Sequence, residues 1–295
     1  MSITIGIDIG GTSVKLLALD EYASIIGETS FRTSSQNGIE SFLSATDEAM
    51  QRLLKKGNAE LAGLGVGCTG PIDYQTGIIL NPYTLPGLEG HSISELLSER
   101  YHVPVVVDND ANTAHVGEVF LQGDAPDNTM MITFGTGVGV SIRLQGTLFR
   151  IPGGIHPEIG HIPTSIKAGD TCYCGRNNCM EHILSGTGIN NHALQCGRKT
   201  PEELMEDPTS SFKQDLKTAL FESVSTLATI FHPQTVYIGG GMQKFFEMYL
   251  LKEVQQLLDA LLPIYGRTHL QGCKAGTRAG SLGAALLAYE KGRLS

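Results

Sequence analysis

The sequence is poor in positive charge and has no long run of apolar residues. Its 21 lysines and arginines stand against 30 aspartates and glutamates, for a formal net charge of −9, and no basic run exceeds the pair Lys55-Lys56. A nucleic-acid surface needs clustered cations, so this composition argues against a nucleic-acid partner. No apolar stretch reaches the roughly 18 residues of a membrane span, and no signal segment opens the chain. We therefore expect a cytoplasmic protein without a membrane partner.

Two common nucleotide-binding motifs are also missing. No GxxxxGK[ST] run occurs, which excludes a P-loop, and no GxGxxG opens a helix after the first strand-like segment. Glycine, in contrast, is plentiful: the 36 glycines occur in clusters, which predicts many tight turns and pockets lined by backbone. The length of 295 residues favours two lobes over one core.

A strand, a turn rich in glycine and threonine, and a second strand occur once in each half of the chain. The two copies are residues 3–8, 10–12 and 14–19, and residues 130–134, 135–139 and 140–144. The repetition predicts an internal duplication, although two unrelated hairpins would give the same pattern.

The rest of each half alternates helix-like with strand-like segments. The expected helices are residues 39–56, 212–231, 244–262 and 281–291, and the expected strands are residues 64–68, 103–108 and 235–238. This alternation predicts the α/β class with mixed sheets. The last helix opens on small residues that allow close packing, and we place it against the first lobe. We expect a small lobe of residues 1–115 plus 280–295, and a large lobe of residues 116–279.

The two glycine-rich turns suit a polyphosphate. Glycine lets backbone N–H groups approach phosphate closely, and Thr12 and Thr136 each add a hydroxyl. Asp8 can hold Mg²⁺, which favours carboxylates together with phosphate oxygens. A third glycine run, at residues 239–241, suits adenine or its ribose, although a bare turn before a helix would look the same. The expected ATP-binding residues are Asp8, Gly10, Gly11, Thr12, Gly135, Thr136, Gly137, Gly139, Gly239, Gly240 and Gly241.

Four residues have the metal-ligand spacing H-x10-C-x-C-x4-C: His161, Cys172, Cys174 and Cys179. Thiolates together with imidazole select Zn²⁺, and four such ligands make a closed structural site. Chance clustering or a redox pair is the alternative. A zinc loop at residues 161–181 would fix Glu158 and Glu181, which lie beside the ligands in sequence and could bind hydroxyl groups.

A valine-rich strand ends in the polar residues Asp108, Asn109 and Asp110. Asp110 could accept a hydroxyl proton where this strand meets a helix. Phosphoryl transfer depends mainly on positioning and charge neutralisation, so an aspartate with an ordinary pKa of about 4 suffices as base. Asn109 can both donate and accept, which suits a sugar diol. A helix N-cap would use the same residue types equally well.

These segments together resemble the ROK family, named for repressors, open reading frames and kinases, over essentially the whole chain. The resemblance rests on residues 8–12, 109–112, 135–139, 158–161 and 172–181. It implies an actin-like (ribonuclease-H-like) α/β fold with two lobes around a central cleft. It also implies ATP with Mg²⁺, a structural Zn²⁺, and commonly a homodimer or homotetramer.

The resemblance further implies a sugar kinase that transfers the ATP γ-phosphate to the 6-hydroxyl of glucose or a β-glucoside. By motif, Asp110 is the catalytic base, and the residues that contact the sugar are Gly70, Asn109, Asp110, Glu158, His161 and Glu181. N-acetylmannosamine and fructose are alternative substrates. A sugar-responsive repressor is the rival from another class. It is disfavoured because only seven residues precede Asp8, where such regulators carry a helix-turn-helix domain.

The chain departs from the family pattern at residues 153–157, at Leu88 and at Asn178. Leu88 stands in about the place of a tryptophan often found in the family. The first two departures could make room beside the sugar for the aglycone of a β-glucoside. Asn178 replaces a glycine of the zinc loop, an exchange that we expect to be tolerated because asparagine also adopts left-handed backbone conformations.

Overall fold

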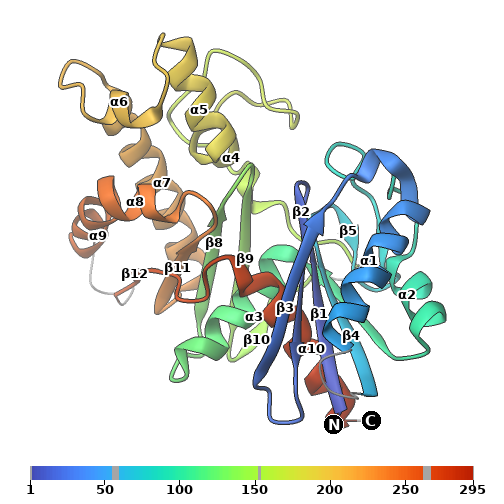
Figure 1. Ribbon diagram of the computed structural model, residues 1–295. Helices are drawn as coiled ribbons and strands as arrows, with labels where there is room; N and C mark the ends of the chain where they lie inside the picture. Colours follow the sequence, from blue (N-terminus) through green and yellow to red (C-terminus); the bar gives the residue numbers. More distant parts are fainter. Residues whose placement is uncertain (1, 55–59, 152–153, 262–266, 295) are drawn as a thin grey trace. The chain divides into compact units, whose positions relative to one another are not determined.

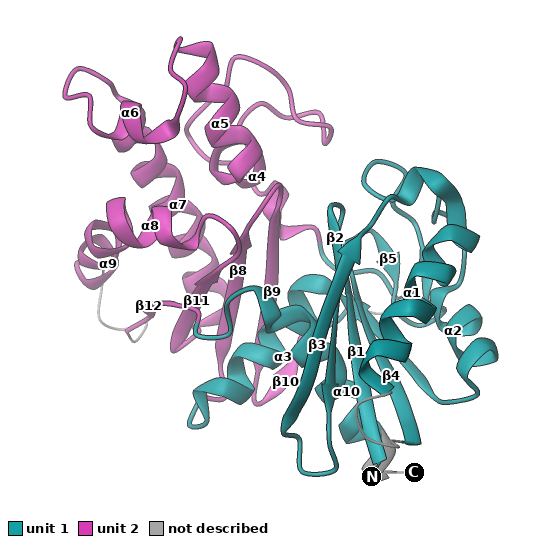
Figure 2. Cartoon of the chain, viewed as in Figure 1, with its two compact units in different colours: residues 1–125, 150–157, 274–295 teal, residues 126–149, 158–273 magenta. Residues whose placement is uncertain are grey.

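The structure, a computed structural model, describes residues 2–54, 60–151, 154–261 and 267–294. It divides into two compact units (Figure 2): unit 1 is Met1–Ala125, Arg150–Pro157 and Lys274–Ser295, and unit 2 is Pro126–Phe149 and Glu158–Cys273. Unit 1 differs from the small lobe expected from the sequence because it also takes in residues 116–125, 150–157 and 274–279. Each unit contains a five-stranded mixed sheet with helices, which confirms the α/β class.

The elements of unit 1 are β1 (Ser2–Ile9), β2 (Ser13–Leu19), β3 (Ile25–Arg32), η1 (Ser35–Asn37), α1 (Gly38–Leu54), β4 (Glu60–Cys68), β5 (Ile72–Asp73), β6 (Ile78–Ile79), α2 (Ile93–Tyr101), β7 (Val105–Asn109), α3 (Asp110–Gln122), η4 (Gly276–Arg278) and α10 (Ala279–Leu294). The main sheet has the order β3-β2-β1-β4-β7. The first three strands are antiparallel neighbours, and β1, β4 and β7 run parallel.

Alternate residues of the strands in unit 1 serve two apolar clusters. Ile5 and Ile7 of β1 belong to the cluster that includes α1 and α2, whereas Leu17 of β2 packs with Leu282 of α10. In Figure 1, α1 and α10 accordingly lie on opposite faces of this sheet. A Cβ at Gly65 would lie 1.7 Å from the carbonyl oxygen of Ala284, so glycine is what allows α10 to approach the sheet closely. The predicted packing of the last helix on the first unit is confirmed.

The elements of unit 2 are β8 (Thr129–Phe134), β9 (Val138–Leu144), β10 (Thr147–Leu148), η2 (Ile159–His161), α4 (Met180–Leu184), α5 (Gly186–Gln195), α6 (Pro201–Met205), α7 (Phe212–Phe231), β11 (Thr235–Gly239), α8 (Gln243–Tyr249), α9 (Leu251–Asp259) and β12 (His269–Gly272). Its sheet has the order β10-β9-β8-β11-β12. Antiparallel and parallel neighbours follow one another as in unit 1, as the repeated pattern in the sequence predicts.

The helix expected at residues 244–262 is wrong as a single element. Leu250, with φ −131°, separates α8 from α9, and no glycine or proline in this stretch announces the break. Residue 262, and residues 55–56 of the expected first helix, lie outside the described residues. Helix α7 has the bounds expected from the sequence. Among the described residues, no helix has the length and apolar character that a membrane crossing requires.

Candidate functional site

The first group of candidate residues lies where the parallel strands of unit 1 end. Asp8 of β1 pairs with Gly67 of β4, which pairs with Asp108 of β7, so the three residues form one row across the sheet. The N–H of Thr69 donates to the carbonyl of Ile9 at 3.0 Å, which ties the segment that leads to Gly70 to the end of β1. The carboxyl ends of parallel strands are the usual place for ligands in open α/β sheets.

Asp8 lies beside a cation that the sequence analysis did not single out. Lys15 pairs with Asp8 across β1 and β2, and its Nζ lies 3.8 Å from the carboxylate. Burial raises the pKa of Asp8 to about 7; the positive charge of Lys15 opposes this rise, and the nearby carboxylate of Asp110 adds to it. The two aspartates therefore share one electrostatic environment.

The helix-cap interpretation of Asn109 is correct. Asn109 is the N-cap of α3, and its Oδ1 accepts the N–H of Ala111 at 2.9 Å. This role does not exclude contact with a sugar, because the cap uses the amide oxygen and leaves the NH₂ group as a donor.

Asp110 is the first residue of α3, and its Oδ1 also accepts the N–H of Ala111, at 2.8 Å. Burial raises the pKa of Asp110, while the charge of His156 and hydrogen bonds from Ala111 and Thr69 oppose that rise. The expectation of an ordinary pKa is therefore wrong, because it took no account of burial. His156, whose charge opposes the rise in the pKa of Asp110, was not identified as a site residue from the sequence.

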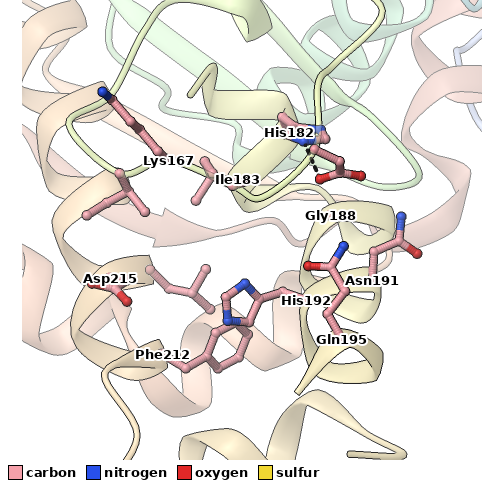
Figure 3. Close-up of a pocket in the computed structure, with 13 residues that line it drawn as sticks. Lys167, His182, Ile183, Gly188, Asn191, His192, Gln195, Phe212 and Asp215 are labelled. Carbon is pink, nitrogen blue, oxygen red and sulfur yellow. Dashed lines mark hydrogen bonds and ion pairs between the residues drawn. The ribbon is translucent and has the colours of Figure 1, made fainter. Parts of the chain in front are cut away.

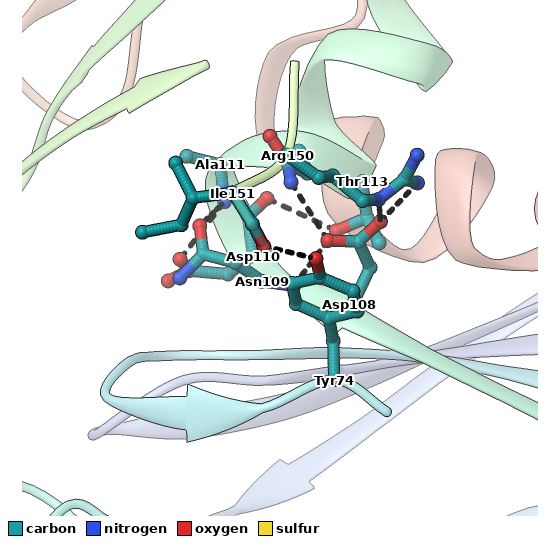
Figure 4. Close-up of polar contacts among 9 residues, drawn as sticks. Tyr74, Asp108, Asn109, Asp110, Ala111, Thr113, Arg150 and Ile151 are labelled. Carbon is teal, nitrogen blue, oxygen red and sulfur yellow. Dashed lines mark hydrogen bonds and ion pairs between the residues drawn. The ribbon is translucent and has the colours of Figure 1, made fainter. Parts of the chain in front are cut away.

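An ion pair between the buried Asp108 and the partly exposed Arg150 holds the strand that leads into Asp110 (Figure 4). Asp108, which is 1% exposed, accepts hydrogen bonds from Arg150, with Nε at 3.1 Å, and from Nδ2 of Asn112 at 2.7 Å. The guanidinium carbon of Arg150 lies 5.9 Å from the centre of the Tyr74 ring, and the Tyr74 hydroxyl donates to the carbonyl of Ile151 at 2.8 Å. Residues 150–151 are thereby attached to the base of α3.

Residues 154–157, part of the family departure, pair with the segment around β5. The N–H of Tyr74 donates to the carbonyl of Gly154 at 2.8 Å, and Asp73 forms an isolated antiparallel bridge with Ile155. His156 is buried, whereas Ile155 is 45% exposed. Gly153, the first residue of this departure, lies outside the described residues.

The other two departures do not behave as the sequence suggests. Leu88 is completely buried in the apolar core of unit 1, so the leucine that stands in place of the family's tryptophan opens no space for an aglycone. Asn178 is not among the residues with positive φ. Instead its Nδ2 donates to the carbonyl of Thr164 at 2.7 Å, and its own carbonyl accepts the N–H of that residue.

Backbone hydrogen bonds hold the two glycine-rich hairpin turns. In unit 1 the N–H of Gly10 donates to the carbonyl of Ser13 at 3.1 Å, and the N–H of Thr33 donates to the carbonyl of Thr12 at 3.1 Å. In unit 2 the N–H of Gly135 donates to the carbonyl of Gly137 at 2.9 Å. The structure places Gly11 and Thr136 in these turns and Gly139 within β9.

The glycine run at residues 239–241 adjoins the turn of the same unit. Gly240 has φ +85°, and a Cβ there would lie 2.4 Å from the carbonyl oxygen of Phe134, so this position requires glycine. The N–H of Met242 donates to the same carbonyl at 2.9 Å. Two of the three predicted nucleotide-binding glycine segments are therefore neighbours in unit 2.

The four predicted zinc ligands come together in unit 2. Their ligand atoms all lie within 4.8 Å of one another, and Nδ1 of His161 is 3.9 Å from Sγ of Cys172. Tetrahedral zinc with Zn–S of about 2.3 Å and Zn–N of about 2.0 Å brings neighbouring ligand atoms to similar separations. Backbone hydrogen bonds close the loop, since Cys172 donates to Arg176 at 2.8 Å and Gly175 donates to Cys172 at 2.9 Å. The donor set and its spacing fit a structural zinc.

The zinc loop carries a group of polar side chains beside its ligands. Glu181, in the first turn of α4, accepts the N–H of Val138 at 2.9 Å through Oε2, and its Oε1 lies 4.0 Å from Nε2 of His161. Glu158 precedes η2, and its carbonyl accepts the N–H of His161 at 3.1 Å. The structure thus places all three unit 2 residues of the predicted sugar set at the zinc loop.

Tyr173 is a member of this group that the sequence analysis missed. Its hydroxyl lies 2.8 Å from Nε2 of His161, and the two rings meet edge to face with centres 4.9 Å apart. Burial of the hydroxyl, and next the negative charges of Glu181 and Glu158, raise the pKa of Tyr173. The only signal in the sequence was its position between two zinc ligands.

A separate pocket of unit 2 lies between the zinc loop, α5 and α7 (Figure 3). Its lining includes Lys167, Asn191 and Asp215, together with His182, whose Nε2 lies 3.0 Å from a carboxylate oxygen of Asp170. None of the site residues predicted from the sequence lines this pocket.

Comparisons with known proteins cover nearly the whole chain. The family model described as the ROK family matches residues 4–291. The chain is 30% identical to a glucokinase of Halalkalibacterium halodurans, over 87% of this chain and 85% of that protein. It is also 30% identical to an N-acetylmannosamine kinase of Escherichia coli, over 97% of this chain and 98% of that protein.

Among solved structures, the chain is similar to a ROK family glucokinase from Streptomyces griseus in complex with glucose and AMPPNP. The TM-score is 0.79 at 25% identity, and the match covers 98% of this chain and 99% of that one. The actin-like ATPase fold that the sequence resemblance implied is thereby confirmed.

Proposed function

The chain belongs to the ROK family, and on this premise we propose that it transfers the γ-phosphate of ATP to the 6-hydroxyl of a glucose-configured sugar. By class it is a sugar kinase, a phosphotransferase that uses ATP. The observation that carries the finer proposal is the position of Asp110: a buried carboxylate in the first turn of α3, electrostatically coupled to Asp8 at the carboxyl edge of the unit 1 sheet.

In this proposal Asp110 is the catalytic base. It accepts the proton of the 6-hydroxyl, the hydroxyl oxygen bonds to the γ-phosphorus, and the bond from that phosphorus to the β-phosphate oxygen breaks to release ADP. A pKa above the ordinary value supports the role, because a stronger base accepts a proton more readily. The charge of His156 and the hydroxyl of Thr69 favour the ionised form that the reaction needs.

Magnesium and nucleotide are assigned to the glycine turns and to Asp8. The adjoining turns at residues 135–137 and 239–241 support phosphate and adenosine binding, because their backbone can approach a ligand without side-chain interference. Asp8 would hold Mg²⁺, and a divalent cation would favour the ionised carboxylate, whose pKa is otherwise about 7. The bound cation supplies neutralisation of the phosphate charge.

The sugar is assigned to Gly70, Asn109 and Asp110 of unit 1, and to the polar group at the zinc loop. Zinc would have a structural role here, since four protein ligands leave no open position for substrate. When bound, it would hold His161 directly and Glu181 through the short segment from Cys179. Glucose is the substrate that the glucokinase relatives support, and N-acetylmannosamine is the alternative supported by the relative from Escherichia coli.

A sugar panel tests the proposal directly. Glucose, N-acetylmannosamine, fructose and a β-glucoside are supplied with MgATP, and ADP release is followed by a coupled assay. The expected result is turnover with glucose, with 6-phosphate identified by phosphorus NMR. Lack of ADP release with every sugar, or tight sequence-specific binding of DNA in a gel shift, would contradict it and favour a regulatory member of the family.

A homodimer or homotetramer is part of the same proposal, because such assemblies are common in the family. Light scattering on the purified protein measures the mass of the assembly and decides between one, two and four copies of the 31.6 kDa chain.

A further inference from the structure

Tyr173 lies in a segment that leaves it little freedom. It follows Cys172 and precedes Cys174, both in the metal-ligand cluster, and backbone hydrogen bonds from Cys172 and Gly175 close the turn around it. The residue is nevertheless 64% exposed, so hydrophobic burial of the ring does not explain its position. The polar contacts of its hydroxyl do.

The hydrogen bonds of the Tyr173 hydroxyl have a definite direction. Nδ1 of His161 faces the cysteine sulfurs, at 3.9 Å from that of Cys172, so a zinc-bound imidazole carries its proton on Nε2. Nε2–H then donates to the hydroxyl oxygen of Tyr173 at 2.8 Å. The hydroxyl proton is left for Glu181, to which Tyr173 is hydrogen-bonded.

Glu181 is held in place to accept that proton. Its Oε2 is occupied by the N–H of Val138 at 2.9 Å, and its Oε1 is directed toward Nε2 of His161 at 4.0 Å. The Tyr173 hydroxyl therefore occupies a position with one fixed donor and one fixed acceptor. A sugar hydroxyl at the zinc loop would therefore contact the hydroxyl of Tyr173, and a larger group on the sugar would contact the ring of Tyr173.

We propose that Tyr173 is a specificity-determining residue that closes the zinc-loop end of the sugar site and restricts the enzyme to hexoses with free hydroxyls at that end. This rests on the proposed function, in which the polar group at the zinc loop contributes to the sugar site; His161 acts there through Tyr173, because its two ring nitrogens face the cysteine sulfurs and the Tyr173 hydroxyl. A hydroxyl of the sugar donates to the Tyr173 oxygen. An acetamido group or an aglycone must displace the ring from His161 and break the bond between Nε2 and the hydroxyl.

Two substitutions separate the hydroxyl from the ring. Tyr173→Phe removes only the hydroxyl, and we expect the KM for glucose to rise roughly 3- to 10-fold, with kcat changed less than about twofold, as for loss of one neutral hydrogen bond in binding. Tyr173→Gly also removes the ring, and the ratio of kcat/KM for N-acetylmannosamine or methyl β-glucoside to that for glucose should rise at least about tenfold. The KM for ATP should stay unchanged in both.

The matched control is Tyr22→Phe, which removes the hydroxyl of an 80% exposed tyrosine in unit 1 and should leave all constants unchanged. Zinc content by atomic absorption and the melting temperature are measured for every variant. Should Tyr173→Gly lose zinc, Tyr173→Phe decides, because it keeps the ring between the same cysteines.

The outcomes separate the inference from the function on which it rests. Without sugar-dependent ADP release by the unsubstituted protein, the proposed function and this inference both fall. If that protein phosphorylates glucose but Tyr173→Phe keeps the same KM for glucose, only the inference is overturned. Preference of the unsubstituted enzyme for N-acetylmannosamine or a β-glucoside would overturn it as well.

Discussion

The two units contain the same sheet but carry their acidic groups in different places. In unit 1 the order β3-β2-β1-β4-β7 ends with β7, whose last residues are Asp108 and Asn109 and which leads directly into Asp110. In unit 2 the order β10-β9-β8-β11-β12 ends with β12, whose residues His269–Gly272 include no acidic side chain. The two carboxylates of unit 2 that belong to the predicted sugar set, Glu158 and Glu181, lie instead outside the sheet, beside the zinc ligands in sequence.

The hairpin turns show the same contrast at smaller scale. The turn of unit 1 follows a strand that carries its own acid, Asp8, with Lys15 opposite it. The turn of unit 2 has no acid on its strand, and the N–H of Val138 binds Glu181 from α4. The two units repeat the same sheet, and each positions its acidic side chains differently: by burial in unit 1, and on a loop that carries the Cys/His cluster in unit 2. The two means should therefore fail differently when they are disturbed.

The largest effect is expected in unit 1 at the base. Asp110→Asn should lower kcat by about 10³-fold or more with little change in KM for sugar, because a positioned general base contributes about 10²–10⁴-fold. Activity is measured by a fixed-time ADP assay, and folding is checked by circular dichroism. Asp124→Asn, at an exposed position of the same unit, is the control. Near-normal turnover by Asp110→Asn would remove this residue from the mechanism.

Loss of zinc should act on binding rather than on the chemical step. Cys174→Ser, or a chelator, should raise the KM for sugar by about 10- to 100-fold and the KM for ATP far less, because the metal orients the residues of the zinc loop. Cys196→Ser, an exposed cysteine outside the cluster, should have no effect. An equal loss of affinity for both substrates would point to unfolding of unit 2 instead.

The ion pair of the buried Asp108 with the partly exposed Arg150, at the start of α3, should matter most for stability. Arg150→Ala leaves the carboxylate of Asp108 buried without its cation, and we expect the free energy of unfolding to fall by about 3 kcal/mol in urea titrations. Arg52→Ala breaks an exposed pair with Glu48 and should cost at most about 0.5 kcal/mol. Equal effects of the two substitutions would show that burial of the pair in unit 1 is unimportant.

Asp8 should destabilise the metal-free protein at neutral pH. The pKa of Asp8 is about 7 in the folded protein and 3.8 ordinarily. Between these two pH values the folded state keeps a proton on Asp8 that the unfolded state has lost. Stability therefore falls as pH rises through this window. Asp8→Asn should raise the free energy of unfolding by about 2 kcal/mol at pH 8 and by almost nothing at pH 4, while MgATP-dependent turnover is lost. An equal increase in the free energy of unfolding at both pH values would show that the ionisation of Asp8 is not its cause.

The smallest expected effect concerns His156. The charge of this residue lowers the pKa of Asp110, so His156→Asn should move the acid limb of the pH profile of kcat/KM to higher pH, by less than about one unit. His232→Asn, in unit 2, is the control. A shift to lower pH, or none, would show that His156 does not act on the base.

The sequence predicted what depends on neighbouring residues and missed what depends on distant ones. The glycine turns, the Asn109 cap and the zinc ligands follow from local chemistry and spacing. Arg150 and Asp108 are separated by 42 positions, and no local pattern announces their pairing. Tyr173 is close to His161 in sequence, yet its role depends on how the loop folds.

Other misses have the same origin. The outer strands β3 and β12 become recognisable only beside their partners, because none of their residues is fully buried. The ordinary pKa expected for Asp110 failed because burial is a property of the fold and not of the residues around it in sequence.

The close approach of α10 to the sheet of unit 1 sets an order of events during synthesis. Helix α10 follows all of unit 2 in the chain, although it packs at Gly65 against strands made long before. At a translation rate of about 5–20 residues per second, the strands of unit 1 must wait on the order of ten seconds or more for this helix. Unit 2 can therefore assemble around its zinc ligands first, and the unit that carries the base is completed last on the ribosome.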